Sequence, residues 1–112
     1  MILVTGASGL VGQHLLQALT VAGKRVRAIS RNTPTTLYAQ IVHELVEWVE
    51  CDILDTPNLE KAFKGITHVY HCAGMVTYDA RFREEMMECN VTGTANIVNF
   101  CLDSGVKKLL HV

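Results

Sequence analysis

The first twelve residues, MILVTGASGLVG, constrain the fold of this chain more than any other segment. An apolar run at 2–5 leads directly into Gly6, Gly9 and Gly12, spaced G-x-x-G-x-x-G, and a helical pattern of leucines follows at once. This order predicts a strand, a tight turn and a helix. One glycine allows the sharp turn, one removes a Cβ that would keep a pyrophosphate away, and one lets the helix pack closely on the strand. Phosphates would then lie on free N–H groups at the positive end of the helix, so we expect a nucleotide site here.

Strand-like and helix-like segments alternate along the whole chain. The predicted strands are 2–5, 25–29, 47–50, 68–72 and 108–112, and the predicted helices are 10–22, 37–45, 57–63 and 81–103. Gly23, Gly65 and Gly105 each follow a predicted helix, where a left-handed residue ends it, and Thr56 before Pro57 is the predicted N-cap of the third helix. Regular alternation predicts one α/β domain over 1–112, with a doubly wound parallel sheet and helices on both faces.

Composition excludes several classes of partner. The chain has 112 residues, 49% hydrophobic and 19% charged, with a net charge of -1, so we expect no nucleic acid and no membrane surface as partner. No apolar run approaches the ~20 residues of a membrane span. The four cysteines form no C-x-x-C pair and no signal peptide precedes the first strand, which predicts free thiols and a cytoplasmic protein. His68 and His71 would point to opposite faces of a strand, so no metal site is expected.

Four motifs in order carry a resemblance to a known family. They are TGASGLVG, Asp52-Ile53, VYHCAG and the string NVTGT that begins at Asn90. Together they resemble the extended short-chain dehydrogenase/reductase family, in the NAD-dependent epimerase/dehydratase superfamily, over the whole chain. The stretch from HVYHCAG to VKKLLHV is most similar to its dihydroflavonol-reductase and hydroxysteroid-dehydrogenase-like branch. The resemblance implies a Rossmann-like sheet of order 3-2-1-4-5. In the family this sheet continues into further strands and a substrate domain, so we expect a chain truncated after the fifth strand.

The resemblance also implies which residues contact the cofactor. The residues implied at the pyrophosphate are Gly6, Ser8, Gly9, Leu10, Val11 and Gly12. Those implied at the adenine are Asp52 and Ile53, and those under the nicotinamide ribose are Cys72, Ala73 and Gly74, with Val76 nearby. Small residues at 72–74 also make sense independently, because a bound ring needs room where the strand order reverses. The alternative is that Ala73 and Gly74 simply begin a loop.

Arg31 follows the second predicted strand, where a carboxylate would bind the ribose hydroxyls of NAD. A guanidinium there suits a 2′-phosphate through charge-assisted hydrogen bonds, with Ser30 and Asn32 as further donors. We therefore expect NADP as cofactor, with NAD possible. The alternative is an ordinary solvated arginine at a strand end.

The predicted helix 81–103 carries two apolar stripes and therefore needs two partners. One stripe is Met87, Val91, Thr94 and Val98, and the other is Met86, Gly93, Ile97 and Phe100. The sheet covers one, and in the family a helix of a second copy often covers the other, so we expect a homodimer. The contact would be made either by strand addition at the edge strand 108–112 or by this helix face, and if the helix face dominates, Ile97 and Phe100 are among the buried contacts. Asn90 resembles the family's asparagine that supports catalysis by holding water in a proton relay. The alternative is a core asparagine satisfied by its surroundings.

The groups that perform chemistry in this family are a Ser or Thr after the fifth strand and a Tyr-x-x-x-Lys helix. None of Tyr38, Tyr70 and Tyr78 has a lysine four residues later. We therefore expect the cofactor portion of an NAD(P)-dependent reductase or dehydrogenase acting on a small carbonyl or alcohol, inactive as a 112-residue chain. The alternatives are a nucleotide-sugar epimerase or dehydratase, and a non-catalytic dinucleotide sensor of the same fold.

Overall fold

Five parallel strands form a single sheet in the order β3-β2-β1-β4-β5. The computed structural model describes residues 1–31, 44–74 and 78–112. The strands are β1 (Ile2–Thr5), β2 (Val26–Ser30), β3 (Val46–Glu50), β4 (His68–His71) and β5 (Lys108–His111). On the central strand, Leu3 lies opposite Arg27 of β2 and Val69 of β4. This order and the parallel pairing confirm the predicted Rossmann-like, doubly wound α/β fold.

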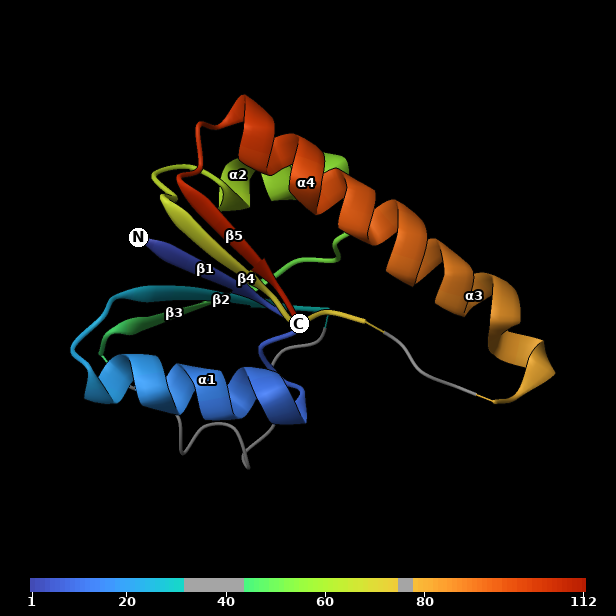
Figure 1. Ribbon diagram of the computed structural model, residues 1–112, viewed down its shortest axis with the longest axis horizontal. Helices are drawn as coiled ribbons and strands as arrows, with labels where there is room; N and C mark the ends of the chain where they lie inside the picture. The colour runs from blue at the N-terminus through green and yellow to red at the C-terminus, as the bar shows by residue number, and fades with distance from the viewer. Residues whose placement is uncertain (32–43, 75–77) are drawn as a thin grey trace.

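Helices cover both faces of the sheet, with α1 on one side and α2 and α4 on the other (Figure 1). The α-helices are α1 (Leu10–Val21), α2 (Thr56–Ala62), α3 (Arg83–Met87) and α4 (Thr94–Asp103). Leu16 of α1 is buried with Val4 and Val26 in one apolar cluster, and Ile97 of α4 is buried with Leu59 in the other. The carboxyl ends of the strands are thereby held between two packed layers.

The glycines predicted to end helices do so, but the predicted N-cap of α2 differs from the observed one. Gly23, Gly65 and Gly105 have φ angles of 76°, 75° and 68°, the left-handed region expected after a helix. The N-cap of α2 is Asp55 rather than Thr56, because an Asp55 carboxylate oxygen accepts a hydrogen bond from Asn58 N at 3.3 Å. Thr56 is therefore already helical, and the prediction of Thr56 as the cap was wrong by one residue.

The predicted helix 81–103 is a continuous helical path of four segments with three different geometries. A 3₁₀ turn η2 (Ala80–Phe82) precedes α3, and a π-helical segment η3 (Glu88–Gly93) joins α3 to α4. Gly93 is buried against Ile53, and a Cβ at position 93 would overlap that side chain, 2.8 Å from its Cγ1. The helical path thus approaches the loop after β3 more closely than any larger residue would allow.

Only one of the two predicted stripes is covered in the described structure. Gly93 and Ile97 are buried on the sheet side, and Phe100 stacks on Phe63 with ring centroids 5.5 Å apart. The exposed stripe is made by Met87, Val91 and Val98. Ile97 is therefore a core residue, and its prediction as a dimer contact was wrong. Phe100 is only partly buried against the core, and its prediction as a contact stays a prediction.

The predicted helix 37–45 lies outside the described residues as far as position 43. Glu44 and Leu45 form a turn that leads into β3, so they do not belong to a helix. Within 1–31, 44–74 and 78–112, no helix is long and apolar enough to cross a membrane.

Candidate functional site

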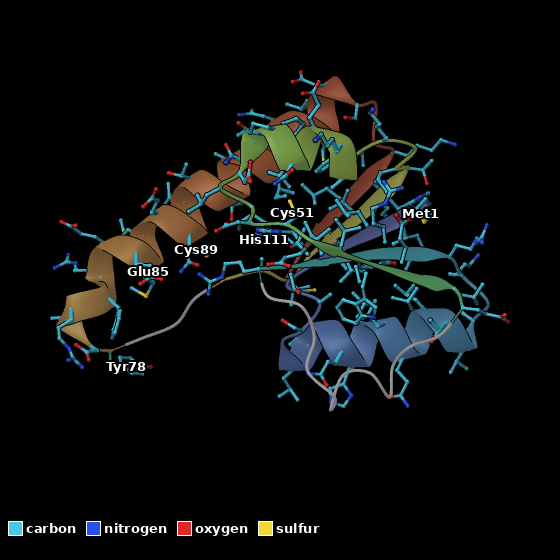
Figure 2. The ribbon with its side chains drawn as sticks, turned by 180° about the vertical axis from the view of Figure 1, so that it is seen from behind. Met1, Cys51, Tyr78, Glu85, Cys89 and His111 are labelled. Atoms are coloured by element: carbon cyan, nitrogen blue, oxygen red, sulfur yellow. The ribbon has the colours of Figure 1, made fainter. Side chains whose placement is uncertain are left out.

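A cavity of about 210 Å³ opens at the carboxyl ends of the central strands. Its lining residues are Gly6, Ser8, Gly9, Ile29, Ser30, Arg31, Cys51, Ile53, Cys72, Ala73, Gly74 and Cys89. Figure 2 shows two of these, Cys51 after β3 and Cys89 on the helical path beyond β4. Ligand pockets commonly measure ~300–1,000 Å³, so this cavity has room for only part of an extended ligand.

The three glycines of the first motif serve different physical purposes. Gly6 has a φ of 62°, and a Cβ there would lie 2.6 Å from Ala73 N. A Cβ at Gly12 would overlap the Gly6 carbonyl oxygen and lie 2.8 Å from Ala7 Cα. Gly6 and Gly12 are therefore required by close backbone approach. Gly9 has an ordinary φ of -76°, lines the cavity, and would place a Cβ 3.3 Å from Gly6 O.

The amino end of α1 lies beside this loop, where the first N–H groups of an α-helix have no partner within the helix. Gly9 is the N-cap, and no side chain in the described part of the chain caps the helix. The side chains of Leu10 and Val11 point to solvent and do not line the cavity. These two residues can therefore contribute only their backbone N–H groups to a ligand in the cavity. Gln13 Nε2 donates to Ser8 O at 2.8 Å and thereby fixes the loop.

The β2 and β3 side of the cavity contains the predicted charged residues. Arg31 lines the cavity, and its Nη1 lies 3.8 Å from Oε1 of Glu85. Asp52 does not line the cavity, because its carboxylate turns back to accept from Leu54 N at 2.9 Å. Ile53 is buried in the lining, and its carbonyl accepts from Asn96 Nδ2 at 3.0 Å. Asn32 and Val76, also predicted at the site, lie outside the described residues.

The floor at residues 72–74 is held by a buried hydrogen-bond network. Thr5 Oγ1 accepts from Cys72 N at 3.2 Å and from Ala73 N at 3.1 Å. With both lone pairs used, its hydroxyl proton points to His71 Nδ1, at 2.6 Å. The His71 proton then lies on Nε2, which donates to Thr94 Oγ1 at 3.0 Å. This chain of hydrogen bonds fixes one neutral tautomer of His71 and joins β1, β4 and α4.

Burial acts on the titrating groups around the cavity. Burial first, and then the charge of His111, whose ring stacks on His71 with centroids 5.2 Å apart, together lower the pKa of His71 to about 4. Burial also raises the pKa of the Cys51 thiol to about 11, with the Asp55 and Asp52 carboxylates adding to the effect. The pKa of Cys72 is raised by burial too. At neutral pH the buried His71 ring and the two cavity-lining thiols are therefore uncharged. Cys51 and Cys72 are consequently poor nucleophiles.

Asn90 lies in the π-helical segment η3 and is exposed. A Cβ on Gly74 would lie 3.5 Å from Asn90 Oδ1, so the amide stands beside the cavity floor. Asn90 is therefore not part of the core formed by the described residues. Its part in a proton relay stays a prediction. His68 is exposed and His71 is buried, on opposite faces as predicted, and the described residues contain no group of three or more His, Cys, Asp or Glu side chains placed to bind a metal.

Sequence reasoning missed the residues that position this site from behind. Thr5, His71 and Thr94 lie inside three of the quoted motifs, yet they were given no role because their hydrogen-bond partners are distant in the sequence. Gln13, Asn96 and Glu85 had no signal of their own. Polar side chains at regular helical positions are ordinarily solvent-facing.

Comparisons with known proteins agree with this geometry. The chain matches the NAD dependent epimerase/dehydratase family over residues 2–112. It is 32% identical to sterol demethylase protein B of Methylococcus capsulatus over 97% of the chain and 33% of that protein. It is 29% identical to cinnamoyl-CoA reductase 1 of Oryza sativa over 98% of the chain and 33% of that protein.

Solved structures give the same relationship. A short-chain dehydrogenase/reductase superfamily protein of Agrobacterium tumefaciens with bound NAD has a TM-score of 0.85 and 28% identity, over 99% of this chain and 31% of that one. UDP-glucose 4-epimerase of Thermus thermophilus in complex with NAD has a TM-score of 0.81 and 28% identity, over 96% and 35%. The chain spans about a third of the length of these relatives. It belongs to the NAD dependent epimerase/dehydratase family and corresponds to the NAD(P)-binding portion of such oxidoreductases and epimerases.

Proposed function

We propose that the cavity at the carboxyl ends of the strands binds the dinucleotide. The observation that carries this proposal is the loop of Gly6, Gly9 and Gly12. A Cβ at Gly6 or Gly12 would overlap backbone atoms, whereas Gly9 lines the cavity and its Cβ would meet only the Gly6 carbonyl oxygen. The pyrophosphate would lie on Ser8, Gly9 and the backbone of Leu10, Val11 and Gly12, at the positive end of α1. The adenine would lie against Ile53 and beside Asp52, whose carboxylate is turned to Leu54 N, and the nicotinamide ribose over Cys72, Ala73 and Gly74 with Val76.

The whole protein is then an NAD(P)-dependent reductase or dehydrogenase of a small carbonyl or alcohol. The cofactor supplies hydride transfer, and this chain's residues bind and orient it. Asn90, beside Gly74, would support catalysis by holding a water molecule for proton transfer. Because the chain has no Tyr-x-x-x-Lys sequence, we expect no turnover by these 112 residues alone.

A second candidate is a nucleotide-sugar epimerase or dehydratase. The Bordetella bronchiseptica enzyme WbmG, solved in complex with NAD and UDP, is 28% identical with a TM-score of 0.85, and it favours this candidate. A dinucleotide sensor without catalysis is the remaining alternative. We also propose a cytoplasmic location, and a second copy of the chain as its protein partner.

The cofactor is NADP in preference to NAD. The guanidinium of Arg31 lines the cavity on the side where β2 ends, and a 2′-phosphate there gains a charge-assisted hydrogen bond that a hydroxyl does not match. Calorimetric titration of the wild type with NADPH and NADH tests this. Arg31→Ala should weaken NADPH about tenfold and leave NADH nearly unchanged. If the wild type binds NADPH and NADH with equal affinity, and Arg31→Ala changes neither affinity, the proposed preference for NADPH is contradicted.

A further inference from the structure

Arg31 does not face the cavity alone. Glu85 of α3 reaches it from the helical layer that contains α4, with Oε1 at 3.8 Å from Arg31 Nη1. The helical path from η2 to η3 extends beyond the carboxyl edge of the sheet (Figure 1), and Glu85 lies on it one turn before Cys89 (Figure 2). Both charged side chains are about half exposed, at 56% for Arg31 and 54% for Glu85. Water and a ligand can therefore reach both groups.

A second observation places more charge at the same wall. Cys89 lines the cavity, and its thiol pKa is raised by burial, lowered by Arg31, and raised by both Asp52 and Glu85. One cation and two carboxylates thus act on a single cavity-lining atom. Arg31 alone would make this wall of the cavity positive, but the two carboxylates offset its charge.

The two cofactors respond differently to such a site. A phosphate monoester carries a charge of about -1.5 to -2 at neutral pH and is repelled by a carboxylate close to its cationic partner. A ribose 2′-hydroxyl has no charge and can donate a hydrogen bond to that carboxylate. Glu85 also competes directly with a phosphate for the Arg31 guanidinium.

We propose that Glu85 is a specificity-determining residue, whose carboxylate weakens the binding of the 2′-phosphate attracted by Arg31 and narrows the preference for NADPH over NADH. The inference rests on the proposed dinucleotide site. The choice between NADPH and NADH then depends on two residues, Arg31 after β2 and Glu85 on α3, and not on the end of β2 alone.

The test compares Glu85→Gln with the matched variant Glu84→Gln. Glutamine keeps the size of glutamate and one acceptor oxygen, replaces the other oxygen by an NH₂ donor, and removes the charge. Glu84 has the same charge on the same helix, but its side chain points about 100° away. In calorimetric titrations, Glu85→Gln should tighten NADPH about three- to tenfold, with little change for NADH, and the gain should shrink at high salt.

Four outcomes decide the matter. A tighter NADPH complex with Glu85→Gln and not with Glu84→Gln supports the inference. The same NADPH-to-NADH ratio in wild type and Glu85→Gln overturns it, as does an equal gain in both variants, which would reflect net charge rather than position. If the wild type binds neither cofactor, the proposed dinucleotide site fails, and this inference fails with it. Circular dichroism of each variant verifies that the fold is intact.

Discussion

At the scale of single residues, similar side chains in one motif have separable roles. Gly6 and Gly12 meet backbone atoms so closely that any Cβ forces the loop to move. Gly9 has an ordinary backbone conformation and meets only one atom, at 3.3 Å. Substitution at Gly9 therefore affects the space in the cavity more than the fold, so it is the position at which binding can be separated from stability.

Gly9→Val should reduce the affinity for NADPH and NADH at least about 100-fold, because the new side chain occupies the proposed pyrophosphate space. Gly65→Ala is the matched control. Gly65 has a φ of 75° and an open surrounding, so its substitution costs stability without touching the cavity. Calorimetry gives the affinities, and urea unfolding gives the stabilities. Unchanged affinity in folded Gly9→Val would remove Gly9 from the proposed site.

Residue-level prediction from sequence succeeded where a residue acts through its own backbone. The helix-ending glycines, the positive φ of Gly6 and the close approach of Gly12 to Gly6 and Ala7 follow from local geometry, which a sequence encodes directly. The Arg31–Glu85 pair does not, because nothing local indicates that the ends of β2 and α3 meet. Asp55 was missed as a cap because Thr56 and Asp55 are both good N-cap residues, and only the structure distinguishes them.

At the scale of elements, His71 ties three of them together. Its ring is 1% exposed, accepts from Thr5 of β1, donates to Thr94 of α4 and stacks on His111 of β5. Protonation of Nδ1 would place a proton against the Thr5 hydroxyl, whose lone pairs already accept from Cys72 N and Ala73 N. The folded chain therefore resists the charged form.

This resistance predicts acid sensitivity of the fold. The folded pKa of His71 is lowered from 6.5 to about 4, so below pH 6.5 the unfolded chain binds a proton that the folded chain refuses. The free energy of unfolding should fall by about 2–3 kcal/mol from this group as the pH drops from near 6.5 to near 4. Urea unfolding of wild type and His71→Gln across this range measures the difference in slope. His14→Gln, at an exposed position of α1, should keep the wild-type slope. Parallel curves for wild type and His71→Gln would contradict the assignment.

The helical path after β4 illustrates what periodicity leaves out. Its apolar spacing predicted one regular helix, whereas the structure inserts the π-helical turn η3 between α3 and α4. Gly93 in η3 lies against the Ile53 side chain, and Asn96 in α4 donates a hydrogen bond to the Ile53 carbonyl. These contacts join segments distant in the sequence, and a hydrogen-bond shift of one residue leaves no trace in the hydrophobic pattern.

At the scale of the whole molecule, the sheet order and layers were predicted and the exposed surface was not. Strand order followed from the family resemblance, and alternation of elements required helices on both faces. Which stripe of the long helical path meets the sheet depended on its rotation, and that rotation is set by tertiary contacts such as Gly93 with Ile53. The outward stripe is consequently Met87, Val91 and Val98, and we propose this stripe as the contact of the homodimer.

The corrected stripe gives a sharp test of association. Val91 is exposed at the middle of the stripe, and a net charge of -1 opposes self-association only weakly, so the wild type should sediment as a dimer at micromolar concentrations. Val91→Glu puts an unpaired charge at the centre of this apolar contact and should weaken the dimer at least about tenfold. Val21→Glu is the matched control, because Val21 is an exposed valine on α1, on the other face of the sheet. A monomeric wild type, or equal dimerisation of the two variants, would show that this stripe is not the contact between copies.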